Sequence, residues 1–237
     1  MTTIPQDQKS LIVMNPNSTE AVTEGIATAL LPFSGRGEPI RCLTLKEGPP
    51  GIETQRQADL TIAPMLALAA AHESEASGYV IACFGDPGLH ALRDQTALPV
   101  VGIQEAAVMT ALTLGQRFGV IAILSASIPR HMRAFGAMGV LDRLAGDRAL
   151  GLGVLELADR DRTLTAMIET GKRLRDKDGA NVLITGCAGM AHLRAPLEDA
   201  TGLPVVEPCQ AATAMALGQI ALNLRHSQTL KDPKHAQ

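Results

Sequence analysis

Two cysteines occur at matching points in the two halves of the chain, each at the end of an apolar run. Cys83 ends the run that starts at Tyr79 and precedes Phe-Gly-Asp-Pro-Gly; Cys187 ends the run that starts at Val182 and precedes Ala-Gly-Met. Thiols suit proton transfer because their pKa lies near working pH and is lowered at a helix N-terminus. Two thiols that face one carbon from opposite sides could remove its proton from one face and return a proton to the other.

A single buried cysteine at a strand end is usually only a small apolar core residue. The matched setting of Cys83 and Cys187 favours a chemical role for both, whereas Cys42 lies in an apolar run and Cys209 has no cysteine counterpart. Asp86 and Pro87 are good first residues for a helix after Cys83, so we expect a helix N-terminus beside that thiol.

The elements that must position these cysteines alternate between short apolar runs and helical stretches. We expect strands at 10–14, 40–45, 79–83, 99–103, 118–124, 150–155, 181–186 and 204–206. We expect helices at 18–31, 55–74, 87–95, 104–116, 129–138, 162–177, 190–200 and 210–224. Pro64 predicts a kink or a later start in the second of these helices. The alternation predicts an α/β fold with parallel sheets.

A weak internal repeat relates the two halves. Residues 98–112 match residues 203–217 at an offset of 105, with eight of fifteen positions identical, and the two cysteines are 104 residues apart. We therefore expect two similar Rossmann-like lobes, related by a pseudo-two-fold axis, with the active site in the cleft between them. The expected boundaries are 1–116 for the first lobe, 117–225 for the second and 226–237 for a polar tail, and the last helix of each lobe could pack on the other lobe.

The composition excludes several classes of function. A net charge of −3 argues against a nucleic-acid surface, and no apolar stretch approaches the roughly 18 residues of a membrane span. The N-terminus lacks an apolar signal region, so we expect a cytoplasmic protein. The six histidines show no metal-ligand spacing and Gly-x-Gly-x-x-Gly is absent, so we expect neither a metal nor a dinucleotide cofactor.

At these residues the chain resembles the hydantoin racemase family, within the aspartate/glutamate racemase superfamily. Four segments carry the resemblance, in order: Asn15-Pro-Asn-Ser-Thr, Gly48-Pro-Pro-Gly-Ile-Glu, Ala82-Cys-Phe-Gly-Asp-Pro-Gly and Gly186-Cys-Ala-Gly-Met. The resemblance spans residues from about 10 to about 224. It implies a cofactor-independent racemase in which Cys83 and Cys187 are the catalytic residues.

The segments differ from those of the amino-acid racemase branch, which resembles Cys-Asn-Thr in the first lobe and Gly-Cys-Thr-His in the second. The absence of those Thr and His groups after Cys83 and Cys187 makes a free amino acid a poor substrate. The resemblance instead implies a cyclic ureide, a 5-substituted hydantoin or the related allantoin. Two alternatives stay open, a cysteine-dependent maleate isomerase or decarboxylase of the same superfamily and a non-catalytic small-molecule binding protein.

The loops at the expected strand ends supply candidate substrate-binding residues. Asn15, Asn17 and Ser18 follow the first strand, and the Asn amides suit the N–H and C=O edges of a ureide ring. Asn17 with Glu20 also resembles a capping box, which would explain Asn17 without a substrate. The remaining candidates are Phe84 and Gly85 after the first cysteine, Ser125 and Ser127 in the second lobe, and Ala188 and Gly189 after the second cysteine. We expect a small-molecule substrate and a homo-oligomer.

Overall fold

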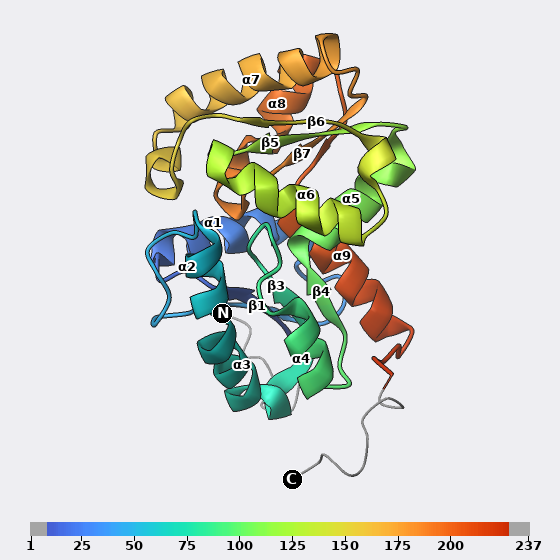
Figure 1. Cartoon of the computed structure of the whole chain (residues 1–237). Helices are drawn as coiled ribbons and strands as arrows, with labels where there is room; N and C mark the ends of the chain where they lie inside the picture. Colours follow the sequence, from blue (N-terminus) through green and yellow to red (C-terminus); the bar gives the residue numbers. More distant parts are fainter. Residues whose placement is uncertain (1–8, 228–237) are drawn as a thin grey trace.

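The computed structural model describes residues 9–227 and contains two four-stranded parallel sheets (Figure 1). The sheet of the first lobe has the order β2-β1-β3-β4, with strands β1 (Ser10–Asn15), β2 (Ile40–Thr44), β3 (Ala76–Ile81) and β4 (Val100–Gly102). The sheet of the second lobe has the order β6-β5-β7-β8, with strands β5 (Phe118–Ala122), β6 (Leu144–Ala149), β7 (Val182–Thr185) and β8 (Val205–Val206). The matching strand orders confirm the predicted α/β fold of two similar lobes.

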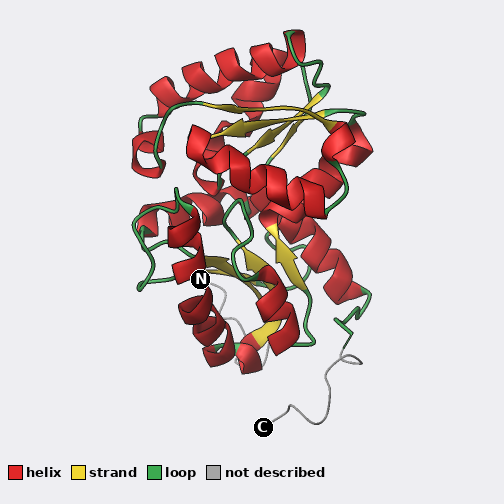
Figure 2. Cartoon of the chain, in the orientation of Figure 1, coloured by secondary structure: helices red, strands yellow, loops and turns green. Residues whose placement is uncertain are grey.

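Helices cover the faces of both sheets (Figure 2). The helices in the first half of the chain are α1 (Glu20–Ala29), α2 (Gln55–Leu60), α3 (Ile62–Ala71), α4 (Leu89–Gln95) and α5 (Ile103–Leu114). Those of the second half are α6 (Ile128–Ala137), α7 (Arg160–Asp176), α8 (Arg194–Thr201) and α9 (Pro208–Ala221), with short 3-10 helices η3 (Ser125–Ser127), η5 (Val154–Ala158) and η6 (Ala188–Leu193). Because both faces are covered, central strands such as β1 are buried along their whole length.

The last helix of each half packs on the sheet of the other half. Helix α5 contacts β5, β7 and β8, whereas α9 contacts β3 and β4, and the two helices contact each other (Figure 1). Alanines on these helices make the close approach possible; the buried ones are Ala106, Ala107, Ala111, Ala211, Ala212 and Ala216. One hydrophobic core therefore runs through both lobes and fixes the strand ends of one relative to the other.

Three element predictions are wrong in detail. The strand expected at 150–155 is β6, six residues earlier, and 150–155 forms a turn followed by the start of η5. The helix expected at 55–74 is two helices that divide at Thr61, which agrees with the later start expected from Pro64; this proline lies in the first turn of α3, where its missing N–H leaves no intrahelical bond unmade. The helix expected at 190–200 begins as η6, and α8 starts only at Arg194.

The described part of the expected tail contacts the first lobe. The His226 N–H donates to the Ala97 carbonyl, and His226 Nε2 accepts from the Val100 N–H at 2.9 Å. Residues 228–237 of the tail lie outside the described residues. Within residues 9–227, no helix is both long enough and apolar enough to cross a membrane.

Candidate active site

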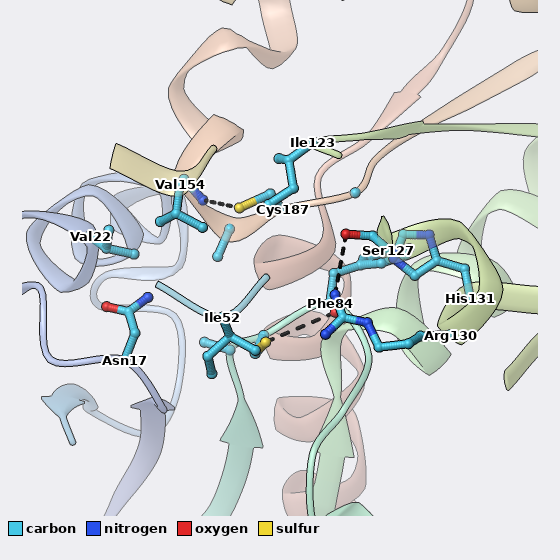
Figure 3. A pocket seen from close by; sticks show the side chains of 15 residues that line it. Asn17, Val22, Ile52, Phe84, Ile123, Ser127, Arg130, His131, Val154 and Cys187 are labelled. Carbon is cyan, nitrogen blue, oxygen red and sulfur yellow. Dashed lines mark hydrogen bonds between the residues drawn. The ribbon is translucent and has the colours of Figure 1, made fainter. Parts of the chain in front are cut away.

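A pocket between the two lobes, at the carboxyl ends of β3 and β7, contains both matched cysteines. The first lobe lines this interlobe pocket with Asn17, Val22, Ile52, Ala82, Cys83 and Phe84. The second lobe lines it with Ile123, Ser127, Arg130, His131, Val154 and residues 186–189, which include Cys187 (Figure 3). The pocket walls are mostly apolar, and each lobe contributes one thiol.

Cys83 lies two residues beyond β3, in a loop whose backbone turns sharply. Gly85 and Asp86 follow it with positive φ angles of 121° and 46°. The Cys83 Sγ makes one weak hydrogen bond, to the Phe84 carbonyl at 3.9 Å. The pKa of Cys83 is raised to about 12, chiefly by burial and also by the charges of Cys187 and Asp86, against the lowering influence of the Arg130 guanidinium.

Cys187 occupies the N-cap position of η6. Its Sγ accepts a hydrogen bond from the Gly189 N–H at 3.4 Å. Burial raises the pKa of Cys187 to about 11, the Gly189 N–H lowers it, and the carboxylates of Glu207 and Glu53 raise it. The expected lowering of a thiol pKa by a helix N-terminus is therefore present at Cys187 only, and burial outweighs it, so that the pKa of each thiol is raised. Both thiols are protonated at neutral pH in the free protein.

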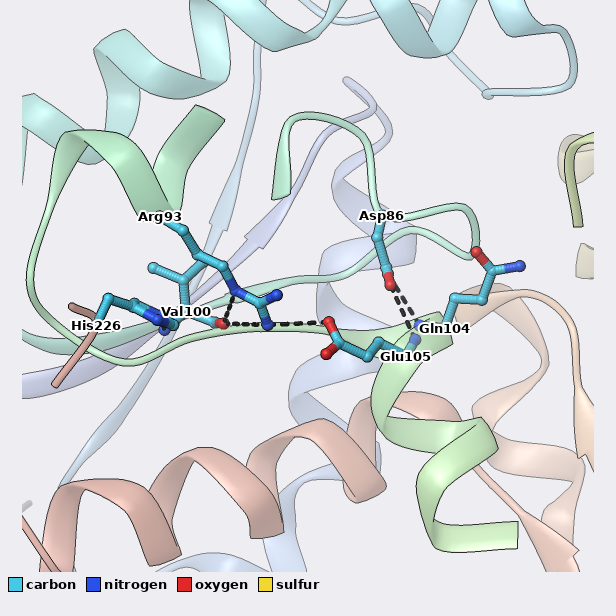
Figure 4. Close-up of polar contacts among 6 residues, drawn as sticks. All are labelled: Asp86, Arg93, Val100, Gln104, Glu105 and His226. Atoms are coloured by element: carbon cyan, nitrogen blue, oxygen red, sulfur yellow. Dashed lines mark hydrogen bonds and ion pairs between the residues drawn. The ribbon is translucent and has the colours of Figure 1, made fainter. Parts of the chain in front are cut away.

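The expectation that Asp86 and Pro87 begin the helix after Cys83 is wrong. Asp86 does not cap the following helix: α4 starts at Leu89, after Gly88 with φ 73°. The Asp86 carboxylate instead accepts from the Gln104 and Glu105 N–H groups, each at 2.9 Å, and so caps α5 (Figure 4). The loop that carries Cys83 is thereby tied to the helix that packs on the second lobe.

The N-terminus of α5 is open to Asp86 because its own N-cap residue, Gly102, has no side chain. A Cβ on Gly102 would lie 2.2 Å from the Asp86 carboxyl carbon. The repeat aligns Gly102 with Glu207, which caps α9 with its own carboxylate through the Cys209 and Gln210 N–H groups at 3.0 and 2.7 Å. Each lobe thus places one carboxylate at an equivalent helix N-terminus, from different sequence positions; Asp86 is half-buried and Glu207 is buried. Burial raises the pKa of Asp86 to about 7, while the two N–H donors lower it.

The predicted substrate-binding residues fall into two groups. Those that line the interlobe pocket are Asn17, Phe84, Ser127, Ala188 and Gly189. Those that do not line it are Asn15, Ser18, Gly85 and Ser125. The Ser18 N–H donates to the Pro49 carbonyl, Gly85 shapes the loop after Cys83, and Ser125 is exposed. A position in a strand-end loop therefore does not by itself place a side chain in the pocket.

Asn15 holds the side chain of Asn17 in place by a hydrogen bond. Asn15 is fully buried, and its Nδ2 donates to Asn17 Oδ1 and Thr23 Oγ1, both at 3.0 Å. Asn17 Oδ1 also accepts from the Thr19 N–H, and Figure 3 shows the Asn17 nitrogen on the pocket side. The capping box with Glu20 does not form, because the N-cap of α1 is Thr19. Asn17 is left with an amide donor for a ligand.

Sequence reasoning missed two polar residues in the first turns of α6. Arg130 lines the pocket, and its Nη2 donates to Ser127 Oγ at 3.2 Å. His131 is buried; its Nδ1 lies 2.7 Å from Asp147 Oδ2, and its ring packs edge-on against Phe84 with centroids 4.9 Å apart. The sequence signal that could have indicated them is the pair Arg130-His131 near the start of a helix that follows a strand end.

Glu53, in one of the segments that carry the resemblance, joins the lobes. Its Oε1 accepts from the Val154 N–H at 2.9 Å, and both Ile52 and Val154 line the pocket. Within residues 9–227, no cluster of three or more His, Cys, Asp or Glu side chains is arranged to hold a metal ion.

Comparisons with known proteins agree with this architecture. A model of the family described as "Asp/Glu/Hydantoin racemase" matches residues 11–216. The chain is 33% identical over 222 residues to a hydantoin racemase of Paenarthrobacter aurescens, covering 92% of this chain and 94% of that protein. It is 36% identical over 211 residues to a hydantoin racemase of Rhizobium meliloti, covering 86% of each. It superimposes on an allantoin racemase from Klebsiella pneumoniae with a TM-score of 0.90 and 30% identity, over 94% of this chain and 92% of that one.

Proposed function

The chain belongs to the Asp/Glu/Hydantoin racemase family, and on that premise we propose that it racemises a cyclic ureide by two-thiol proton transfer. The substrates we propose are 5-substituted hydantoins and the related allantoin. The observation that carries the proposal is the presence of Cys83 and Cys187 in one pocket, each supplied by a different lobe at an equivalent strand end. Relatives named hydantoin racemase and a structural relative named allantoin racemase support the same class of activity.

In the proposed reaction one cysteine acts as a thiolate and the other as a thiol. The thiolate removes the proton from the substituted ring carbon: an S–H bond forms, the C–H bond breaks, and its electron pair moves into the adjacent carbonyl as an enolate. The second thiol, Cys187 when Cys83 is the base, then donates its proton to the opposite face of the carbon. The reverse assignment serves the other enantiomer.

The pocket supplies hydrogen-bond donors and apolar walls for the ring. The Asn17 amide and the Ser127 hydroxyl are the polar groups that we assign to the ureide edge, because both line the pocket. Phe84, Val22 and Ile52 supply apolar walls. An apolar wall strengthens each electrostatic interaction inside the pocket, because no water competes for the developing charge.

Isotope exchange tests the proposal. One enantiomer of a 5-substituted hydantoin is incubated with the protein in deuterated water, and optical rotation is followed together with deuterium at the ring carbon. We expect rotation to be lost with incorporation of deuterium, and Cys83→Ser and Cys187→Ser each to abolish racemisation. Cys42→Ser is the matched control, because Cys42 lies on β2 and does not line the pocket. Racemisation at the unmodified rate in either of the first two variants would refute the two-thiol assignment.

The same assay separates the alternatives. The likeness to an allantoin racemase structure makes allantoin the second substrate to assay, beside hydantoins with alkyl substituents. A binding protein would bind the ureide without any deuterium exchange. A maleate isomerase or decarboxylase would act on its own dicarboxylate and leave the ureide unchanged.

Two further expectations belong to this proposal. Free thiols as bases require a reducing compartment, which supports a cytoplasmic location; all four cysteines are unpaired. Self-association into a homo-oligomer stays a prediction, and light scattering of the purified protein measures it.

A further inference from the structure

Arg130 carries a positive charge into the interlobe pocket without a matching negative charge. It is the third residue of α6, and Figure 3 shows its side chain extending toward the pocket beside Ser127 and Phe84. Its Nη2 donates to Ser127 Oγ at 3.2 Å, whereas its Nε is buried and has no hydrogen-bond partner among the described residues. No ion pair within residues 9–227 includes Arg130.

A guanidinium in this position is unfavourable for the empty protein. Removing a charge from water costs free energy that a hydroxyl partner only partly returns, so such groups are normally paired. Burial accordingly lowers the pKa of Arg130, and the opposing influences are the charges of Cys83 and Asp59. A residue held at such a cost in a cleft is typical of a functional site, where the missing anion arrives with the reaction.

The two thiols differ in their charged surroundings, and the difference identifies that anion. Arg130 lines the pocket with Cys83 and lowers the pKa of this thiol, whereas Cys187 and Asp86 raise it. Cys187 has the Gly189 N–H on one side and the carboxylates of Glu53 and Glu207 nearby. The Arg130 charge therefore favours a thiolate at Cys83, whereas the carboxylates that act on Cys187 oppose a thiolate there.

We propose that Arg130 is a further catalytic residue, whose guanidinium balances the negative charge first on the Cys83 thiolate and then on the substrate enolate. This role rests on the proposed function. When Cys83 takes the ring proton, its sulfur becomes neutral and the electron pair moves to the carbonyl oxygen, so the charge shifts within the pocket while Arg130 stays cationic. Arg130 donates hydrogen bonds and transfers no proton. Arg130 lines the pocket, and its guanidinium can donate to the enolate oxygen there.

The first test needs no substrate. The rates of alkylation of Cys83 and Cys187 by iodoacetamide are measured by mass spectrometry between pH 7.5 and 9.5, in the unmodified protein and in Arg130→Gln and Arg130→Lys. Loss of the cation should raise the pKa of Cys83 by about one unit, so Arg130→Gln should alkylate Cys83 about tenfold more slowly. Cys187 serves as the internal reference and should change less than about twofold. Arg130→Lys should restore most of the Cys83 rate.

The matched control is Arg133→Gln, one turn further along α6. Arg133 is exposed and donates to Gln55, and it does not line the pocket, so this variant removes the same charge from the same helix. It should leave both alkylation rates unchanged. An equal fall at Cys83 in Arg133→Gln would overturn the proposal, because general surface charge would then explain the effect.

The second test uses the racemisation assay. Arg130→Gln should lower kcat about 100-fold, as the loss of one donor to a transition-state oxyanion does, with KM changed less than about threefold. A rise in KM with unchanged kcat, or an unchanged rate at Cys83, would overturn the proposal. If the unmodified protein racemises no ureide, the proposed function fails, while the alkylation test still decides whether Arg130 stabilises charge on Cys83.

Discussion

Replacing Gly102 by alanine tests whether the first lobe depends on the cap that Asp86 supplies. Gly102 has φ −85° and ψ 142°, a conformation that alanine adopts without strain. The obstacle is the Asp86 carboxyl group, whose carbon would lie 2.2 Å from the new Cβ. Gly102→Ala must therefore displace this carboxylate from the N-terminus of α5.

Displacing the carboxylate breaks two hydrogen bonds and leaves the helix without its cap. The donors are the Gln104 and Glu105 N–H groups, each 2.9 Å from a carboxylate oxygen. Hydrogen bonds to a charged group contribute about 1.5–3 kcal/mol each, and water regained by the carboxylate offsets part of this, so we expect a decrease of about 3 kcal/mol in the free energy of unfolding. In an Asp86→Ala background the obstacle is gone, and Gly102→Ala should instead stabilise by about 0.4–1 kcal/mol.

Equilibrium unfolding in urea measures all four members of this cycle. The prediction is a coupling of about 4 kcal/mol between the two positions, with a change of sign for Gly102→Ala between the backgrounds. Gly218→Ala, on an open face of α9 where a Cβ meets no atom within 4 Å, is the control and should stabilise by about 1 kcal/mol. An equal cost of Gly102→Ala with and without Asp86 would refute the reasoning. Because Asp86 anchors the Cys83 loop, Gly102→Ala should also lower kcat.

Three further predictions follow from the site. The pKa of Cys83 is raised to about 12 and that of Cys187 to about 11, so only a small fraction of either cysteine is thiolate between pH 7 and 9. Because this fraction grows tenfold with each pH unit, kcat/KM from initial rates should rise about tenfold per unit in this range. A flat profile would contradict this. His131→Ala leaves the Asp147 carboxylate buried without its imidazole partner and should lower the free energy of unfolding by about 3 kcal/mol or more, whereas an unchanged urea midpoint would show that the pair contributes little. Gly48→Ala places a Cβ 2.3 Å from the Pro16 carbonyl oxygen, so the loop that carries Asn17 should shift, with a decrease of about 1–3 kcal/mol in the same experiment and a higher KM.

Much of the architecture could be read from the sequence because its signals are local. Buried parallel strands appear as apolar runs, which located β1, β3, β5 and β7 to within a few residues. The strand β6 was misplaced because it is a partly exposed edge strand, where Asp147 and Arg148 interrupt the apolar pattern. The repeat placed Cys83 and Cys187 at equivalent strand ends, which is where the structure has them.

The chemistry of the site depended on contacts between distant segments. Asp86 followed by Pro87 has the local pattern of a helix start, yet its carboxylate binds N–H groups of α5 that lie 18 and 19 residues along the chain, because Gly102 leaves room for it. The thiol pKa values follow burial that no local pattern reveals. Arg130 was missed because a basic residue near a helix start usually faces water, and only the packing of the two lobes turns it into the pocket.

The exchange of α5 and α9 between the lobes has a consequence for protein synthesis. A ribosome makes β3 and β4 early, but the helix that covers them, α9, is made only after the whole second sheet. Domains commonly fold in order as they are made, and exposed apolar surface on a nascent chain invites aggregation. In this chain the first lobe cannot finish folding before α9 leaves the ribosome, so its apolar sheet face must wait, exposed or held by chaperones, for the last part of the chain to arrive.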